Sequence, residues 1–309
     1  MPEGSSIWVV TQTVLYNNKG DEIERYVRSF ARAVRNARSL FPDMNIKLVF
    51  GDCSEASVLN HESLEHLQTL LLDDSIAFAY EIFSENLGSA RAHNRLFFES
   101  NPAQECDVVI IANPDIYFGP FSILELLSTL SDQSIGMAEA RQIPYQHPKS
   151  WNLDTGDTSW AATACAAIKG YLFVELGGFD DSSFFLYCDD VDFSWRLRLA
   201  GHRVVFVPSA SVFHDKRLSL DAMPKPSSAE RYYSIEASLM MTWKYSRDDL
   251  LDKYLEMCKV SEHEDFKRAY IWFMKRFNDR SLPDRLDEQG KVAEFRGDDY
   301  AVHLFTYGN

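Results

Sequence analysis

The feature that most constrains the fold is a regular alternation of strand and helix patterns over residues 7–130. Residues 7–15 are apolar and β-branched, and apolar residues then recur at helical spacing from Ile23 to Ala37. The same strand–helix pattern follows at 46–50 and 64–72, at 76–83 and 89–99, and at 108–111 and 123–130. Four such units predict an α/β domain with a Rossmann-like, mostly parallel sheet flanked by helices.

The loops that follow the predicted strands are polar and in part acidic. They span residues 13–17, 51–54, 85–88 and 113–115. Open α/β sheets bind their ligands at the carboxyl ends of the strands, where the chain leaves the sheet. We therefore expect the functional site at this edge.

The pattern changes twice in the rest of the chain. After Met137 the alternation fades, and residues 144–160 form a long Trp- and Pro-containing stretch that we interpret as a wall or lid of an acceptor site. Residues 223–228 resemble a linker, and helices are predicted at 231–245, 250–260 and 265–277. We expect a catalytic domain over 1–216 and a C-terminal helical extension over 217–309.

Composition narrows the class of protein. The chain of 309 residues is 46% hydrophobic and 25% charged, which is typical of a soluble globular protein. Its formal net charge of -15 argues against nucleic acid as a partner, because such partners are met by clustered Lys and Arg. No apolar run approaches the roughly 20 residues that span a bilayer, so we expect a cytoplasmic location. The five cysteines form no CxxC pair, which indicates neither a disulfide framework nor a thiolate zinc site.

Two acidic motifs carry the candidate chemistry. Asn113-Pro114-Asp115 directly follows a predicted buried strand, where a carboxylate is suited to Mg2+ or Mn2+, although the same tripeptide is ordinary turn chemistry. The second motif, residues 189–192, reads Asp-Asp-Val-Asp and opens a predicted helix that ends at Gly201. Helix capping, worth roughly 0.3–1 kcal/mol per acid, explains one or two of these carboxylates but not three. Close carboxylates raise one another's pKa, and one of them is a candidate general base.

His214 is a third candidate. It follows the predicted strand 202–207 and the segment 208–213. A lone histidine is more often structural than functional. If the strand returns beside Asp115, however, the imidazole completes a metal site.

Together these segments resemble the inverting family 2 glycosyltransferases with the GT-A fold, over roughly residues 7–245. The stretch 11–17 resembles the family's opening strand, and Asp52 stands where the family has a base-contacting Asp. The stretch 86–94 is similar to the Asn-x-Gly…Asn segment near the diphosphate sugar. The resemblance implies a donor-binding set made of Thr11, Thr13, Tyr16, Asn17, Asp52, Asn86, Gly88, Arg91, Asn94 and Asn113.

The resemblance also implies the catalytic and metal-binding groups. Asp190 matches the family's base, with Asp189 beside it, and Asp115 and His214 match the ligands of Mn2+ or Mg2+. Asn113 stands in the place of the first acid of the family's Asp-x-Asp motif, which lowers the ligand charge and is familiar in rhamnosyltransferase-like members. Two residues are expected on the acceptor side, Trp160 and Asp192. Residues 232–237 lack the Arg-Asn pair that the family usually has there, which leaves their role open.

The implied reaction is the inverting transfer of a sugar to a hydroxyl group. The donor would be deoxythymidine-diphosphate (dTDP) rhamnose or a UDP-sugar, and the acceptor a glycan or lipid-linked saccharide in surface polysaccharide synthesis. The alternative is a nucleotide-sugar-binding subunit without turnover, which would need no base. A nicotinamide-dependent oxidoreductase is disfavoured because the first strand–helix turn has no GxGxxG, and a metal-dependent phosphohydrolase stays open on the acidic residues alone.

The last predicted helix is amphipathic and basic. Phe266, Tyr270, Phe273, Met274 and Phe277 recur at helical spacing, with Lys and Arg largely on the other faces. Such a helix suits peripheral contact with the inner face of a membrane. It equally suits packing against the catalytic domain or against a second subunit in a homo-oligomer.

Overall fold

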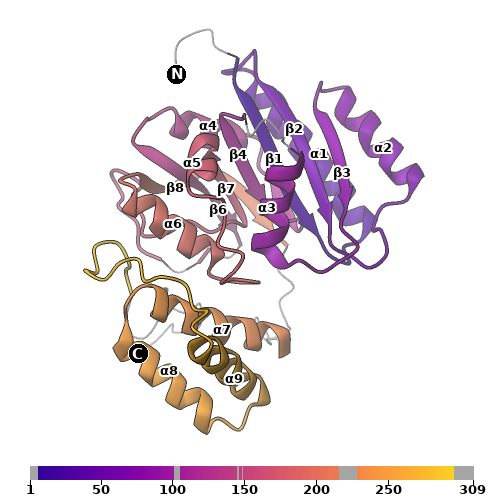
Figure 1. Ribbon diagram of the computed structural model, residues 1–309. Coiled ribbons are helices and arrows are strands. Elements are labelled where there is room, and N and C mark those ends of the chain that lie inside the picture. The colour runs from indigo at the N-terminus through magenta and orange to yellow at the C-terminus, as the bar shows by residue number, and fades with distance from the viewer. Residues whose placement is uncertain (1–5, 101–104, 145, 148, 216–227, 296–309) are drawn as a thin grey trace.

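The computed structural model describes residues 6–295 apart from 101–104, 145, 148 and 216–227 (Figure 1). Its strands are β1 Trp8–Leu15, β2 Asn45–Asp52, β3 Ala77–Ile82, β4 Val108–Ala112, β5 Ile116–Phe118, β6 Ile135–Ile143, β7 Cys165–Lys169 and β8 Arg203–His214. Its helices are α1 Gly20–Ala37, α2 His61–Leu72, α3 Gly88–Ser100, α4 Ser122–Leu130, α5 Gly170–Glu175, α6 Asp189–Leu199, α7 Ser228–Lys244, α8 Asp248–Val260 and α9 Glu264–Asn278.

The described strands form one mixed sheet in the order β3-β2-β1-β4-β7-β6-β8-β5. The first four strands are parallel, β7 runs antiparallel to both β4 and β6, and β8 runs parallel to β6. Helices α1, α2 and α4 contribute to the apolar core on one face, whereas α3, α5 and α6 contribute to the core on the other. The predicted α/β class, with a sheet flanked by helices, is confirmed.

The second half of the sheet differs from the sequence prediction. Strand β6 was not predicted, and β8 continues through Pro208 to His214 rather than ending at 207. The pairing of β8 with β6 skips from Val207 to Ser211, so Pro208 lies in an irregularity of the ladder where its missing N–H costs no hydrogen bond. The short strand β5 then pairs antiparallel with the end of β8, with Ile116 opposite His214.

The three predicted C-terminal helices are confirmed as α7, α8 and α9, which lie together beside the sheet domain (Figure 1). The proposed boundary at 216/217 and most of the predicted linker lie outside the described residues. Phe273 of α9 is buried against Trp243 of α7, so this part of the apolar face of α9 packs within the protein, whereas Phe277 is 49% exposed. Among the described helices none combines the length and the apolar character that crossing a membrane requires.

Candidate active site

The carboxyl edge of the sheet brings Asp115 and His214 together. Asp115 follows β4, and His214 ends β8, which pairs with β5 beside it. The Nε2 atom of His214 lies 3.2 Å from Oδ2 of Asp115, whose side chain is 42% exposed. The return of this strand beside Asp115, on which the metal-site prediction depended, is confirmed.

A buried hydrogen bond orients the His214 ring. Its Nδ1 atom lies 2.8 Å from Oε1 of Gln142 at the end of β6. An amide oxygen only accepts, so Nδ1 carries a proton and Nε2 is the ring nitrogen that faces Asp115. The hydrogen bond to Gln142 thus fixes the ring so that Nε2 and the Asp115 carboxylate lie 3.2 Å apart, where both can serve as ligands of one cation.

The pair fits a divalent cation that is shared with substrate. Among the described residues no group of three or more His, Cys, Asp or Glu side chains gathers around one point. Mg2+ is commonly held by one or two protein ligands together with phosphate oxygens and water, and Mn2+ accepts imidazole nitrogen as well as oxygen. Asp115 and His214 would thus hold the ion, with the substrate supplying further ligands.

Asp190 lies in the first turn of α6 and contacts residue 163, in the segment that follows the 144–160 stretch. Its Oδ2 atom accepts a 3.4 Å hydrogen bond from the Thr163 N–H, and Oδ1 accepts one of 2.8 Å from Val191. The next carbonyl in that segment, Ala164, accepts from the Asn113 N–H at 2.9 Å. One short stretch of chain therefore contacts both acidic motifs. Burial and the adjacent Asp189 raise the pKa of Asp190 to about 7, which suits a general base.

Asp189 is more enclosed than Asp190. Asp189 is only 4% exposed, and within the described part of the chain its Oδ2 atom has no hydrogen-bond partner. Burial raises the pKa of Asp189, and the nearby Asp192 carboxylate adds to this effect. An enclosed acid with an unsatisfied oxygen is suited to receive a hydroxyl of a bound ligand.

A buried ion pair that sequence reasoning missed lies beside Asp190. Lys149, from the 144–160 stretch, contacts Oε2 of Glu139 on β6, and it donates a 2.6 Å hydrogen bond to the Trp160 carbonyl. The same Glu139 oxygen accepts from the Ala162 N–H at 2.9 Å, one residue before the N–H that meets Asp190. Burial lowers the pKa of Lys149, whereas Glu139 opposes this shift. The pair therefore fixes the segment that leads to Asp190.

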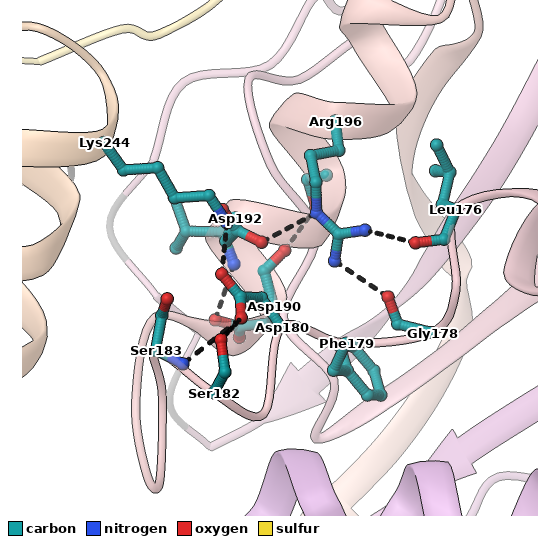
Figure 2. Close-up of polar contacts among 12 residues, drawn as sticks. Leu176, Gly178, Phe179, Asp180, Ser182, Ser183, Asp190, Asp192, Arg196 and Lys244 are labelled. Atoms are coloured by element: carbon teal, nitrogen blue, oxygen red, sulfur yellow. Dashed lines mark hydrogen bonds and ion pairs between the residues drawn. The ribbon is translucent and has the colours of Figure 1, made fainter. Parts of the chain in front are cut away.

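The two residues predicted on the acceptor side are placed differently from the expectation. Trp160 is only 2% exposed, and its ring lies against the Lys149 ammonium at 4.2 Å, so no face is open for a sugar. Asp192 is fully buried and ion-paired to Arg196 and Lys244 (Figure 2). With no exposed surface and both carboxylate oxygens paired to cations, Asp192 has no oxygen left for an acceptor. Both are corrections to the predicted acceptor set.

Of the residues predicted to bind the donor, those within β1 are buried, whereas those in the loop after it are exposed. Thr11 and Thr13 are fully buried, and the Thr13 hydroxyl is 2.6 Å from the Tyr26 hydroxyl in the core. Neither hydroxyl reaches the surface, because odd-numbered residues of β1 face α1. Tyr16 and Asn17, just past the strand, are exposed.

Asp52 ends β2 and is also fully buried. Its Oδ1 atom accepts from the Ser54 N–H at 2.9 Å, and Oδ2 accepts from the Val58 N–H at 2.7 Å and from the Tyr80 hydroxyl. Ser54 in turn accepts from the Asn17 N–H at 2.8 Å. The carboxylate therefore shapes the two loops where a nucleotide base is expected.

The stretch 86–94 opens α3. Asn86 is exposed, and Gly88 has a φ of +72° with the Phe185 carbonyl where a Cβ would lie, so this turn requires glycine. Arg91 is exposed and forms no hydrogen bond or ion pair within the described part of the chain, which leaves its cation available to an anion. Asn94 instead holds the backbone of Phe179 with two hydrogen bonds of 2.8 Å, a structural task.

The comparisons agree with this geometry. No protein-family model matches the chain. A solved structure, GalNAc-T7 with UDP, GalNAc and Mn2+, superposes with a TM-score of 0.60 at 14% identity and covers 91% of this chain and 60% of that one. The fold is therefore that of the GT-A glycosyltransferases.

Two curated proteins show the sequence likeness. The N-acetylglucosaminyl-diphospho-decaprenol L-rhamnosyltransferase of Mycobacterium tuberculosis is 30% identical over 165 residues, which cover 41% of this chain and 53% of that protein. Rhamnosyltransferase WbbL of Escherichia coli K12 is 38% identical over 55 residues, 18% of this chain and 20% of that protein. The chain thus matches about half the length of the first relative. In sequence the chain is similar to rhamnosyltransferases, and in fold to the GT-A glycosyltransferases.

Proposed function

We propose that this protein is an inverting glycosyltransferase that moves rhamnose from dTDP-rhamnose to a hydroxyl of a lipid-linked saccharide or glycan in surface polysaccharide synthesis. The observation that carries the proposal is the arrangement at one sheet edge of the Asp115–His214 pair and of Asp190, which share the segment 163–164 as a neighbour. The names of the two relatives support rhamnose as the sugar, and the first relative's name supports a diphospholipid-linked acceptor.

In the proposed reaction Asp190 acts as the base. Its carboxylate takes the proton of the acceptor hydroxyl while the oxygen forms a bond to the anomeric carbon of the donor. The bond from that carbon to the diphosphate breaks, and its electron pair leaves with the nucleoside diphosphate. Attack from the face opposite the leaving group inverts the anomeric configuration. A divalent cation at Asp115 and His214 would supply charge stabilisation to the diphosphate.

Other side chains would bind and orient the donor. The exposed Arg91, with no partner in the described part of the chain, lies on the first turn of α3, whose N-terminus also attracts phosphate. Asp52 holds the loop at 53–58 for the nucleotide base, and Asp189 offers its free oxygen to a sugar hydroxyl.

The proposal is tested first by ligand-dependent thermal stability. The chain is heated with dTDP, UDP, dTDP-rhamnose or UDP-sugars, with and without Mn2+ or Mg2+, since ligands that bind the native state raise its melting temperature. We expect the largest shift with dTDP-rhamnose plus metal, and Asp115→Ala should remove the metal-dependent part. No shift with any nucleotide, for folded protein, would contradict the proposal.

Acceptor-dependent release of nucleoside diphosphate then separates an enzyme from a binding subunit. A transferase releases dTDP only when acceptor is present, and Asp190→Asn abolishes that release while keeping the thermal shift. A binding subunit would show the shift but no release in the wild type.

A further inference from the structure

A buried charge network joins the C-terminal helices to the segment that carries Asp190 (Figure 2). Lys244, the last residue of α7, has its Nζ atom 2.6 Å from Oδ2 of Asp180 and 2.6 Å from Oδ1 of Asp192. Arg196 on α6 donates to the other oxygen of Asp192 at 2.8 Å. Two cations thus balance two carboxylates, and the Lys244 and Asp192 side chains are almost completely removed from water.

The network holds both ends of the segment 180–192, because Lys244 pairs with Asp180 and with Asp192. Asp180 also accepts hydrogen bonds from the Ser182 hydroxyl and the Ser183 N–H, which fixes the turn at 180–183. Asp192 lies two residues after Asp190, in the first turn of α6. Lys244 therefore ties residue 180 to residue 192, and Asp189 and Asp190 lie between these two anchors.

Further contacts fix the C-terminal end of α7 against α6. The hydroxyl of Tyr245, the residue after α7, donates to the Asp192 carboxylate at 2.9 Å and lies 3.1 Å from its backbone carbonyl. Its ring packs edge-on against Trp195 at 4.7 Å between centroids. Arg196 extends the same network by donating to the carbonyls of Leu176 and Gly178, at 2.8 Å each (Figure 2).

Such a network is suited to fixing the relative positions of the groups that it joins. A buried ion pair adds little net stability compared with apolar residues of equal volume, because both charges lose their water. Its directional contacts, however, allow only one arrangement of the groups that it joins. Burial opposes ionisation of Asp180, yet the Lys244 ammonium holds the pKa of this acid at about 2, so the pairing persists across the physiological range.

We propose that Lys244 is a positioning residue for Asp190, and that α7 is thereby a working part of the catalytic site rather than only a surface for docking. The inference rests on the proposed transfer reaction. A shift of about 1 Å in a catalytic group can lower the rate by about 100-fold, even when the changed residue does not touch the substrate.

The test compares four variants in the intact chain. Lys244→Met removes the ammonium, Lys244→Arg keeps the charge, and Asp180→Asn removes one anchor while Lys244 stays paired with Asp192. Lys267→Met on the surface of α9 is the matched control, because within the described residues this lysine pairs only with Glu264, at 2.8 Å. For each variant the assay measures kcat, donor KM, dTDP affinity and melting temperature.

We expect kcat to fall about 100-fold in Lys244→Met and about tenfold in Asp180→Asn, with dTDP affinity unchanged and most of the rate restored in Lys244→Arg. Lys267→Met should match the wild type. If Lys244→Met does not fold, Asp180→Asn and Lys244→Arg carry the test.

Unchanged kcat in a folded Lys244→Met or Asp180→Asn would overturn the inference and leave the proposed function standing. A loss of dTDP affinity parallel to the loss of kcat would also overturn it, because that pattern is general destabilisation. A wild-type chain that transfers no sugar would instead remove the proposed function, and the inference with it.

Discussion

The two halves of the sheet bury their acids in different ways. In the N-terminal half, Asp52 is fully buried and its partners are neutral: two backbone N–H groups and the Tyr80 hydroxyl. In the C-terminal half, Asp192 is equally buried but is paired with two cations, Arg196 and Lys244. The neutral arrangement shapes a loop, whereas the ionic one ties helices together. A second buried ion pair in this half, Lys149–Glu139, lies close enough to Asp190 for its lysine to act on the Asp190 charge.

The largest expected effect is on catalysis in the C-terminal half. Replacing Asp190 with Asn keeps the shape but removes the base, and general-base catalysis typically contributes about 10²–10⁴-fold. We expect kcat to fall by about that factor, with dTDP affinity unchanged. Steady-state kinetics with saturating acceptor, together with nucleotide titration, provide the measurement. A variant with more than half the wild-type kcat would show that another group is the base.

The next largest expected effect is on stability, and it tests the contrast between ionic and neutral burial of an acid. Asp192→Ala leaves Lys244 and Arg196 without their shared carboxylate, and breaking a buried pair in this way costs about 3–5 kcal/mol. Urea unfolding should show that loss in the free energy of unfolding. The exposed Asp252 on α8 offers a matched control, for which Asp252→Ala should change stability by less than about 0.5 kcal/mol. Equal effects at residues 192 and 252 would show that the buried ionic pairing of Asp192 adds nothing to stability.

Asp52→Asn should have a smaller effect on stability. The amide keeps one accepting oxygen but presents an N–H2 group to a backbone N–H, so the expected cost is about 1–3 kcal/mol. The same urea measurement applies, and the dTDP affinity is expected to fall because the loop at 53–58 loses an anchor. A loss as large as that of Asp192→Ala would mean that neutral and ionic burial are equivalent here.

The pH dependence of the rate tests the electrostatics around Asp190. A base must be deprotonated to act, so kcat should fall as pH decreases through about 7, the raised pKa of this acid. The charged groups that face it are Asp189 on α6 and Lys149 from the 144–160 stretch, with Glu139 behind Lys149.

Removing the Lys149 cation should raise the pKa of Asp190 further. The acid limb of the kcat profile in Lys149→Met should therefore move to higher pH, whereas Lys267→Met leaves it in place. A limb that moves to lower pH in Lys149→Met would contradict the expectation that the Lys149 charge lowers the pKa of Asp190.

The sequence predicts the N-terminal half well because its apolar periodicity is uninterrupted. Strands β1 to β4 and helices α1 to α4 are found at the expected places, within a few residues at each end. In the other half, β6 carries Glu139 and Gln142 on buried positions, which breaks the apolar pattern that marks a strand. Strand β8 contains Pro208 and β5 has three residues, so neither gives a complete signal.

The candidate site divides in the same manner. Local motifs gave Asp115, Asp190 and His214, and the strand pairing places the first and last together. Lys149 and Lys244 are single charges whose partners lie 10 to 64 residues away, so nothing local distinguishes them from solvated lysines. Buried pairing is a tertiary property, and only the fold reveals it.

The most direct measurement is the product itself. Wild-type protein is incubated with dTDP-rhamnose, Mn2+ and an N-acetylglucosaminyl-diphospholipid analogue, and the lipid fraction is analysed by mass spectrometry and by the anomeric NMR signals of the added sugar. We expect a rhamnosylated acceptor of inverted configuration, and no product with Asp190→Asn. Product with retained configuration would contradict a single displacement with Asp190 as base. No glycosylated product with any nucleotide-sugar donor, from protein that binds nucleotide, would contradict the transferase itself.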